Sequence, residues 1–353
     1  MASFKPVVIR ALAWATLSMA ELSASSAQQQ PPQPSPPPRF REAVTVERIV
    51  VDVRVVDDSG QPVPGLGPED FKVKLDGKPV LVESALWVGV EEEEAGVVVT
   101  PEDTAAAPAN ESAQPRLVVF FLQRDLEPSR ILGLLKILEK VDRLLGVLAP
   151  GDRAAALLFD TALSRLEDFT DDRARVRRAI EDGIVGRRRA VQEGEEPSLF
   201  AHLDDWASRR AASPERALQV VGEALQELPG AKTLVFLGWG IGRFDRGGVS
   251  MTPDYEPARR ALQKARCSVF ALDITEADYH SLEVGLIQVA EDTGGFYAKT
   301  YLFPDQAVER MERALQGYYV LSFERPEGKP GSRRLDIGLN KRKGTVMAPN
   351  AVG

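Results

Sequence analysis

Short apolar runs alternate with segments of helical periodicity between residues 117 and 316, and this alternation limits the possible folds more than any other feature. The expected strands, buried on both faces, are 117–122, 154–159, 232–237, 267–272 and 296–298. The expected helices are 129–148, 171–184, 214–228, 255–264, 280–293 and 304–316. Repeated strand and helix units predict the Rossmann-like α/β class, with a mostly parallel central sheet and helices on both faces.

The two ends of the chain have a different pattern, because both are rich in β-forming residues. Expected strands at 44–56, 70–75 and 80–90 are separated by turns, and two further strands follow at 318–323 and 334–339. Neither set is large enough to be stable alone. We therefore predict a small β-sandwich-like unit in which the N- and C-terminal strands pack together.

The first residues are typical of an export signal, which we place at residues 1–27. Lys5 and Arg10 provide a basic start, an apolar run follows at 11–20, and small residues at 25–27 suit cleavage. The apolar run is too short to span a bilayer, so no membrane segment is expected after signal removal. The mature chain is expected to be exported, to the periplasm or outside the cell.

Composition divides the remaining chain into five parts. We expect a Pro-rich linker at 28–40, an N-terminal β unit at 41–90, an acidic and Ala/Pro-rich linker at 91–114, an α/β domain at 115–317 and C-terminal strands at 318–353. Asn110 begins an N-glycosylation triplet, a pattern that is common by chance.

Charge argues against a nucleic-acid partner, because the net charge of −8 does not provide the basic surface that phosphate binding uses. The arginine run at 186–189 is balanced by Glu193, Glu195 and Glu196, which favours a solvated loop.

Several segments of the chain resemble a known family. VDVRVVDDSGQPVPGLGPEDFKVKLDGKPV at the N-terminal end is followed, in order, by LAPGDRAAALLF, KTLVFLGWG, SVFALDITE, VAEDTGGFYAKT and LQGYYVLSF. This series resembles the bacterial exported VWFA-related proteins, which carry a von Willebrand factor A type domain. The resemblance implies a Rossmann-like A type domain beside a β unit, and adhesion or assembly in place of catalysis.

Metal-binding members of the wider family hold a Mg²⁺ at the carboxyl ends of the strands, and the resemblance implies that this chain has lost the site. The first loop needs an Asp and two Ser, where this chain has Gln123, Asp125 and Glu127. The Asp of a later loop is replaced by Trp239. We therefore expect a degenerate, metal-free A type domain with no cofactor.

Two alternatives remain open at this edge of the sheet. Asp125, Glu127 and Asp273 all follow strands and would form a rebuilt acidic site for Mg²⁺ or Ca²⁺ if they converged. Trp239, between two glycines, either fills the space of the lost ion or contacts a partner, since aromatic residues are enriched in interface hot spots.

Catalytic motifs are weak, so the prediction is that the chain is not an enzyme. His202 and His280 are the only histidines, and His202 would need Asp204 or Asp205 as a partner. The single Cys267 begins an apolar run and is expected to be a buried hydrophobe. An unrecognised hydrolase is the last alternative.

The sequence thus predicts an exported protein-interaction module. Its partner is expected to bind the rim formed by the loops 123–129, 238–244 and 273–279. Within that rim the candidate partner-binding residues are Gln123, Asp125, Glu127, Trp239, Arg243 and Phe244.

Overall fold

The computed structural model describes residues 47–89, 116–187, 190, 194, 196–301, 303–326 and 331–353. The expected export signal, the Pro-rich linker, the linker at 91–114 and the triplet at Asn110 lie outside these residues. Val46–Gly353 form one compact unit. Among the described helices, none has the length and apolar character that crossing a bilayer requires.

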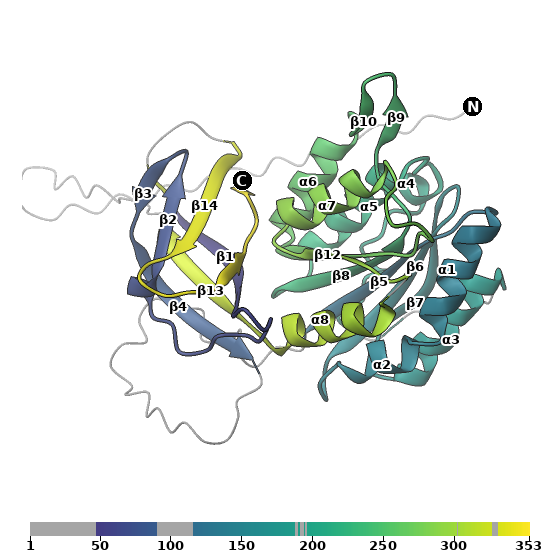
Figure 1. The fold of residues 1–353 in the computed structure, drawn as a ribbon, viewed down its shortest axis with the longest axis horizontal. Helices are drawn as coiled ribbons and strands as arrows, with labels where there is room; N and C mark the ends of the chain where they lie inside the picture. The colour runs from purple at the N-terminus through teal and green to yellow at the C-terminus, as the bar shows by residue number, and fades with distance from the viewer. Residues whose placement is uncertain are drawn as a thin grey trace, which may run out of the picture. The chain divides into compact units, whose positions relative to one another are not determined.

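A six-stranded sheet forms the centre of the α/β part, in the spatial order β12, β11, β8, β5, β6, β7 (Figure 1). Its strands are β5 (Leu117–Gln123), β6 (Arg153–Phe159), β7 (Leu163–Thr170), β8 (Lys232–Gly238), β11 (Cys267–Asp273) and β12 (Phe296–Lys299). Neighbouring strands are parallel except at β7, which pairs antiparallel to β6. The predicted mostly parallel sheet is confirmed.

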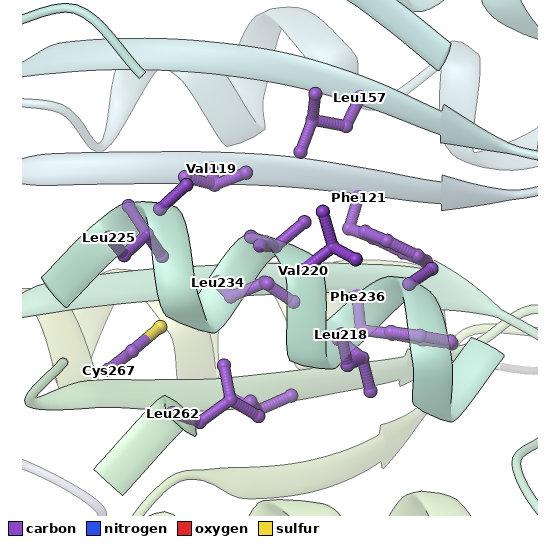
Figure 2. Close-up of a cluster of buried hydrophobic side chains, with 14 of the residues drawn as sticks. Val119, Phe121, Leu157, Leu218, Val220, Leu225, Leu234, Phe236, Leu262 and Cys267 are labelled. Carbon is purple, nitrogen blue, oxygen red and sulfur yellow. The ribbon is translucent and has the colours of Figure 1, made fainter. Parts of the chain in front are cut away.

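Helices cover both faces of this sheet. They are α1 (Pro128–Leu138), α2 (Val141–Gly146), α3 (Arg173–Val185), α4 (Asp205–Arg209), α5 (Pro214–Gln226), α6 (Tyr255–Lys264), α7 (Glu283–Asp292) and α8 (Pro304–Gln316). The side chains of β5 alternate between two cores, because successive residues of a strand point to opposite faces. Phe120 packs with α1, α2, α3 and α8, whereas Phe121 packs with α5, α6 and α7. Figure 2 shows the second of these cores.

Side chains cap the N-termini of two of these helices. Asp172 accepts hydrogen bonds from the backbone N–H groups of Ala174 (2.9 Å) and Arg175 (3.1 Å) at the start of α3. Ser213 accepts one from the N–H of Arg216 at 3.1 Å and begins α5. Each cap satisfies backbone donors that a helix leaves unpaired in its first turn.

Strands from the two ends of the chain build a β-sandwich, as predicted. One sheet has the order β15 (Thr345–Met347), β1 (Arg48–Val56), β13 (Gly317–Glu324), β4 (Val82–Gly89). The other has the order β16 (Ala351–Val352), β14 (Arg333–Leu339), β2 (Phe71–Leu75), β3 (Lys78–Val80), with the short 3₁₀ helix η1 (Pro68–Asp70) before β2. A single apolar core, which includes Val53, Val73 and Leu321, lies between them.

The structure differs from the sequence prediction at the helix expected at 129–148, at β7 and at the short helix α4, which was not expected. The helix expected at 129–148 is two helices, because a turn in which the N–H of Lys140 bonds to the carbonyl of Ile137 at 2.8 Å separates α1 from α2. Strand β7 was not predicted, since its sequence LSRLEDFT has no regular alternation and the strand is an irregular edge of the sheet.

Candidate functional site

The carboxyl ends of β5 and β8 are joined by the side chain of Gln123. Its Oε1 accepts hydrogen bonds from the backbone N–H groups of Trp239 (2.9 Å) and Gly240 (3.1 Å), and its Nε2 donates to the Gly240 carbonyl (2.8 Å). Gln123 is only 1% exposed. The prediction that Gln123 contacts a partner is therefore wrong, because its amide is buried and already bonded to the backbone.

Trp239 lies half-buried at the end of β8 and packs against the core formed with α1, α2, α3 and α8. The guanidinium carbon of Arg130, on α1, lies 3.5 Å from the centroid of the indole ring. Arg130 also forms an ion pair with Asp125. A protein cation therefore lies over the aromatic ring of Trp239, at the carboxyl edge of the sheet.

The two acidic residues of the first loop stabilise that loop. Asp125 accepts a hydrogen bond from the N–H of Glu127 at 2.9 Å, in addition to its contact with Arg130. Glu127 precedes α1 and accepts a hydrogen bond from the hydroxyl of Ser129 at 3.2 Å. Both carboxylates thus have partners within the loop and the first turn of α1.

Asp273, the last residue of β11, is the centre of a separate buried polar cluster. Its carboxylate accepts hydrogen bonds from the N–H of Thr275 (2.9 Å) and the hydroxyl of Tyr297 (2.7 Å), and it lies 2.7 Å from Nε2 of His280. Glu283, on α7, accepts a second bond from Tyr297 at 3.2 Å and pairs with Lys299 at 2.7 Å.

Hydrogen bonding decides the ionisation of this cluster. Burial alone would raise the pKa of Asp273, but the hydrogen bonds from His280, Tyr297 and Thr275 outweigh it and lower the pKa below its ordinary value. Burial raises the pKa of Tyr297, and its hydrogen bond to Asp273 adds to the effect. Asp273 is therefore a carboxylate and Tyr297 a neutral donor near pH 7.

The rebuilt acidic site, as predicted from sequence, does not form. Within the described part of the chain, the group of possible ligand atoms that converges is Asp273, His280 and Glu283, all within 4.8 Å of one another, and neither Asp125 nor Glu127 belongs to it. Those two are held instead by contacts within their own loop and with α1.

A Mg²⁺ does not fit the position that the family resemblance implies. The oxygen of Gln123 is occupied by two N–H donors, and Asp125 is neutralised by Arg130. At the Asp273 cluster, the imidazole of His280 suits a softer ion such as Zn²⁺, and the ammonium of Lys299 already supplies a positive charge.

Residues 243–250 form a hairpin that sequence reasoning missed. It consists of β9 (Arg243–Asp245) and β10 (Gly248–Ser250), and Figure 1 shows it extending away from the sheet. Asp245 accepts hydrogen bonds from the Gly247 N–H (2.8 Å) and the Ser250 hydroxyl (2.9 Å), which close the turn. The pair of glycines at 247 and 248 was the available signal.

Four segments that follow strands at this edge, three loops and the β9–β10 hairpin, each expose one large apolar side chain. They are Leu126 after β5 (87% exposed), Phe244 after β8 (68%), Tyr279 after β11 (69%) and Phe303 after β12 (59%). Arg243 is also exposed, beside Phe244. Leu126, Tyr279 and Phe303 are not among the candidate residues chosen from sequence, because exposure of a loop residue is not visible there.

The residues considered for catalysis have other roles. His202 is exposed, Asp204 caps α4 through the N–H of Ala207 (2.7 Å), and Asp205 pairs with Arg165 (2.7 Å). In the described residues, His202 therefore does not pair with either acid as the sequence suggested. Burial raises the pKa of Cys267 to about 12, so its thiol is not ionised near pH 7.

These features define a Rossmann-like α/β domain with an additional β-sandwich. Among solved structures, a von Willebrand factor type A protein from Catenulispora acidiphila is similar at 12% identity, with a TM-score of 0.39, over 81% of this chain and 75% of that one. Human COPII-coat protein Sec24c is similar at 12% identity and a TM-score of 0.39, over 70% of this chain and 44% of that one.

Three N-terminal domains of the type V pili tip protein Mfa5 from Porphyromonas gingivalis are similar at 12% identity and a TM-score of 0.38, over 77% of this chain and 56% of that one. The chain thus spans less than half of Sec24c and about half of the Mfa5 fragment. At these identities the likeness extends to the fold alone. No protein-family model and no curated protein matches the chain.

Proposed function

We propose that the chain is an exported, non-enzymatic module for adhesion or assembly that binds a protein partner at the carboxyl edge of its six-stranded sheet. The observation that carries this proposal is the group of four exposed apolar residues, Leu126, Phe244, Tyr279 and Phe303, each from the loop after a different parallel strand. Ligands of open α/β sheets bind at this edge, and exposed aromatic residues are enriched where interfaces gain most of their affinity.

The partner contact works without the metal ion of the wider family. Arg130 over Trp239 provides a fixed positive charge, and Gln123 joins the two central strands without a cation. Trp239 thereby has the filling role: it supports Arg130 and the loop that leads to Phe244. Export rests on the N-terminal signal pattern, and a protein partner rests on the acidic net charge of −8 together with the apolar rim.

A capture experiment tests the proposal. The chain without residues 1–27 is immobilised and exposed to a cell-envelope extract of its own organism, and bound proteins are identified by mass spectrometry. The variant Phe244→Ser with Tyr279→Ser should lose a specific partner. Leu81→Ser, which removes an equally exposed leucine (85%) from the β-sandwich, should retain it, and a chelator should have no effect.

Equal capture by the two variants would contradict the proposed surface. Loss of capture in chelator would instead favour the second candidate, a cation-dependent adhesion domain. The observation that favours this second candidate is the convergence of Asp273, His280 and Glu283. Because this group includes an imidazole, Zn²⁺ is the ion to add back.

A further inference from the structure

A cavity of about 440 Å³ lies between β6, β7 and the last turns of α3. Arg124 follows β5, Asp160 follows β6 and Gly186 ends α3, so the cavity opens at the same edge of the sheet as the apolar rim. Its volume falls within the range of pockets that bind small groups or peptide segments, about 300–1,000 Å³.

Arginine dominates the walls of this cavity. The guanidinium groups come from Arg124, Arg165, Arg175, Arg178 and Arg187. The carboxylates come from Asp160, Glu167 and Asp182. Among the described residues that line the cavity, guanidinium groups therefore outnumber carboxylates.

Three of these arginines are neutralised by carboxylates: Arg124 by Asp160 (3.2 Å), Arg175 by Glu167 (2.6 Å) and Arg165 by Asp205 (2.7 Å). The other two lack a carboxylate at hydrogen-bond distance. Within the described part of the chain, Arg178 forms no ion pair, and its Nε donates to the carbonyl of Ala174 at 3.1 Å. Arg187 forms two longer ion pairs, with Asp182 at 3.7 Å and with Glu181 at 3.8 Å, both beyond hydrogen-bond distance.

The two arginines without a close carboxylate share the cavity with apolar side chains. Arg178 and Asp182 are one helical turn apart on α3, and Arg187 follows the end of that helix. Leu158 and Leu166 also line the cavity. The arginine run at 186–189, expected to be only a solvated loop, thus contributes one side chain to a cavity.

We propose that this cavity binds the carboxylate of an acidic residue flanked by apolar residues in a protein segment. The inference rests on the proposed function for the nature of the ligand, a protein. The planar fork of a guanidinium binds a carboxylate through two parallel hydrogen bonds. A single negative charge suits the site, because Asp182 and the negative end of the α3 dipole oppose a multiply charged anion.

Two labelled peptides test the site on the full chain. Gly-Leu-Glu-Leu-Gly and its twin Gly-Leu-Gln-Leu-Gly, both with blocked ends, are titrated and followed by fluorescence anisotropy. The Glu peptide should bind at least about fivefold more tightly than the Gln peptide, since hydrogen bonds to a charged group are the stronger kind. Arg178→Ala combined with Arg187→Ala should remove this difference.

Matched variants distinguish a loss of peptide recognition from unfolding of the chain and from a loss of positive charge elsewhere on its surface. Arg209→Ala, which removes an exposed arginine outside the cavity, should leave binding of the Glu peptide unchanged. Arg178→Lys retains the charge but loses the fork, and it should bind less tightly than the native chain. Thermal melting of each variant establishes that the fold persists.

Three outcomes would overturn the inference: equal binding of the Glu and Gln peptides, full binding by the double arginine variant, or calorimetric binding of inorganic phosphate with none of the Glu peptide. The Phe244→Ser variant distinguishes the two proposals. This variant should retain peptide binding. If it loses partner capture and still binds the peptide, the result bears on the rim of the proposed function and not on the cavity.

Discussion

The side-chain oxygen of Gln123 lies 2.9 Å from the backbone nitrogen of Trp239, and this bond joins β5 to the loop after β8. The two residues replace positions at which the family resemblance implied acidic metal ligands. A neutral amide accepts N–H bonds on one side and donates to the Gly240 carbonyl on the other (2.8 Å), which a carboxylate cannot do. The side chain of Gln123 therefore joins the two central strands through hydrogen bonds.

Replacing Gln123 with Leu should destabilise the chain by about 1–3 kcal/mol, because two backbone N–H groups and one carbonyl lose a buried partner. Urea denaturation followed by circular dichroism measures the change. Gln61→Leu, at an exposed glutamine, should change the free energy of unfolding by less than about 0.5 kcal/mol. Similar effects of the two substitutions would show that the amide of Gln123 is not structural.

Addition of Mg²⁺ or Ca²⁺ should leave the melting temperature of the chain unchanged, and chelator should not lower it. A ligand that binds only the folded state stabilises it in proportion to the logarithm of its concentration over Kd, so an ion held at the sheet edge would be visible in this measurement. Differential scanning fluorimetry with each ion at millimolar concentration provides the readout. A rise in melting temperature that disappears in Asp125→Asn would contradict the metal-free proposal.

The sequence was sufficient to predict the sheet, because strands buried on both faces appear as continuous apolar runs such as LVVFFL in β5. The sandwich was predictable for a different reason: neither end of the chain has enough strands to bury a core, so each needed the other. Strand β7 was not predictable in this way, since Arg165 and Glu167 interrupt its apolar pattern at the sheet edge.

The candidate site was only partly predictable. Phe244 and Arg243 were expected in a loop after β8, but the structure places both in strand β9 of the hairpin that follows β8. Whether the acids converge depends on local partners that sequence does not reveal: Arg130, in the first turn of α1, pairs with Asp125, and His280 pairs with Asp273. The positions of the candidate residues along the chain predicted that they lie at the carboxyl edge of the sheet. Side-chain contacts decided which of the acidic residues come together there.

Asp273 should make the stability of the chain depend on pH on the acidic side. Its pKa is lower in the folded state than the value of about 3.9 expected when unfolded. The stabilisation is therefore present above that value and is lost as the pH falls through the folded-state pKa. Urea denaturation between about pH 3 and pH 7 measures the free energy of unfolding of the native chain and of Asp273→Asn. The native chain should have the larger value, the difference should be greatest at neutral pH, and it should narrow on acidification.

Asp58→Asn, at an exposed aspartate, is the matched control. Its free energy of unfolding should have the same pH dependence as that of the native chain. A gap between the native chain and Asp273→Asn that stays constant with pH would mean that Asp273 contributes by packing and not by its charge.

Arg54 should be among the residues that contribute most to stability, because it is a buried cation that connects β1 to the amino ends of β8 and β11. It donates to the hydroxyl of Ser268 (2.8 Å) and the carbonyl of Ala314 (3.0 Å), and its guanidinium carbon lies 5.1 Å from the centre of the Phe270 ring. Arg54→Ala should cost about 2–4 kcal/mol, since it leaves buried polar groups unpaired and opens a cavity.

Two comparisons separate the reasons for that cost, using urea denaturation of the full chain. Arg54→Met retains most of the side-chain volume and removes the charge, so it should cost less than Arg54→Ala, because replacing a buried charge with an apolar group avoids its desolvation. Arg48 lies on the same strand as Arg54 and forms an exposed ion pair with Glu83 of β4 at 2.9 Å. Arg48→Ala breaks this pair and should cost less than about 1 kcal/mol. If Arg48→Ala and Arg54→Ala were equally destabilising, the contacts of Arg54 with Ser268 and Ala314 would not hold β1 against the α/β sheet.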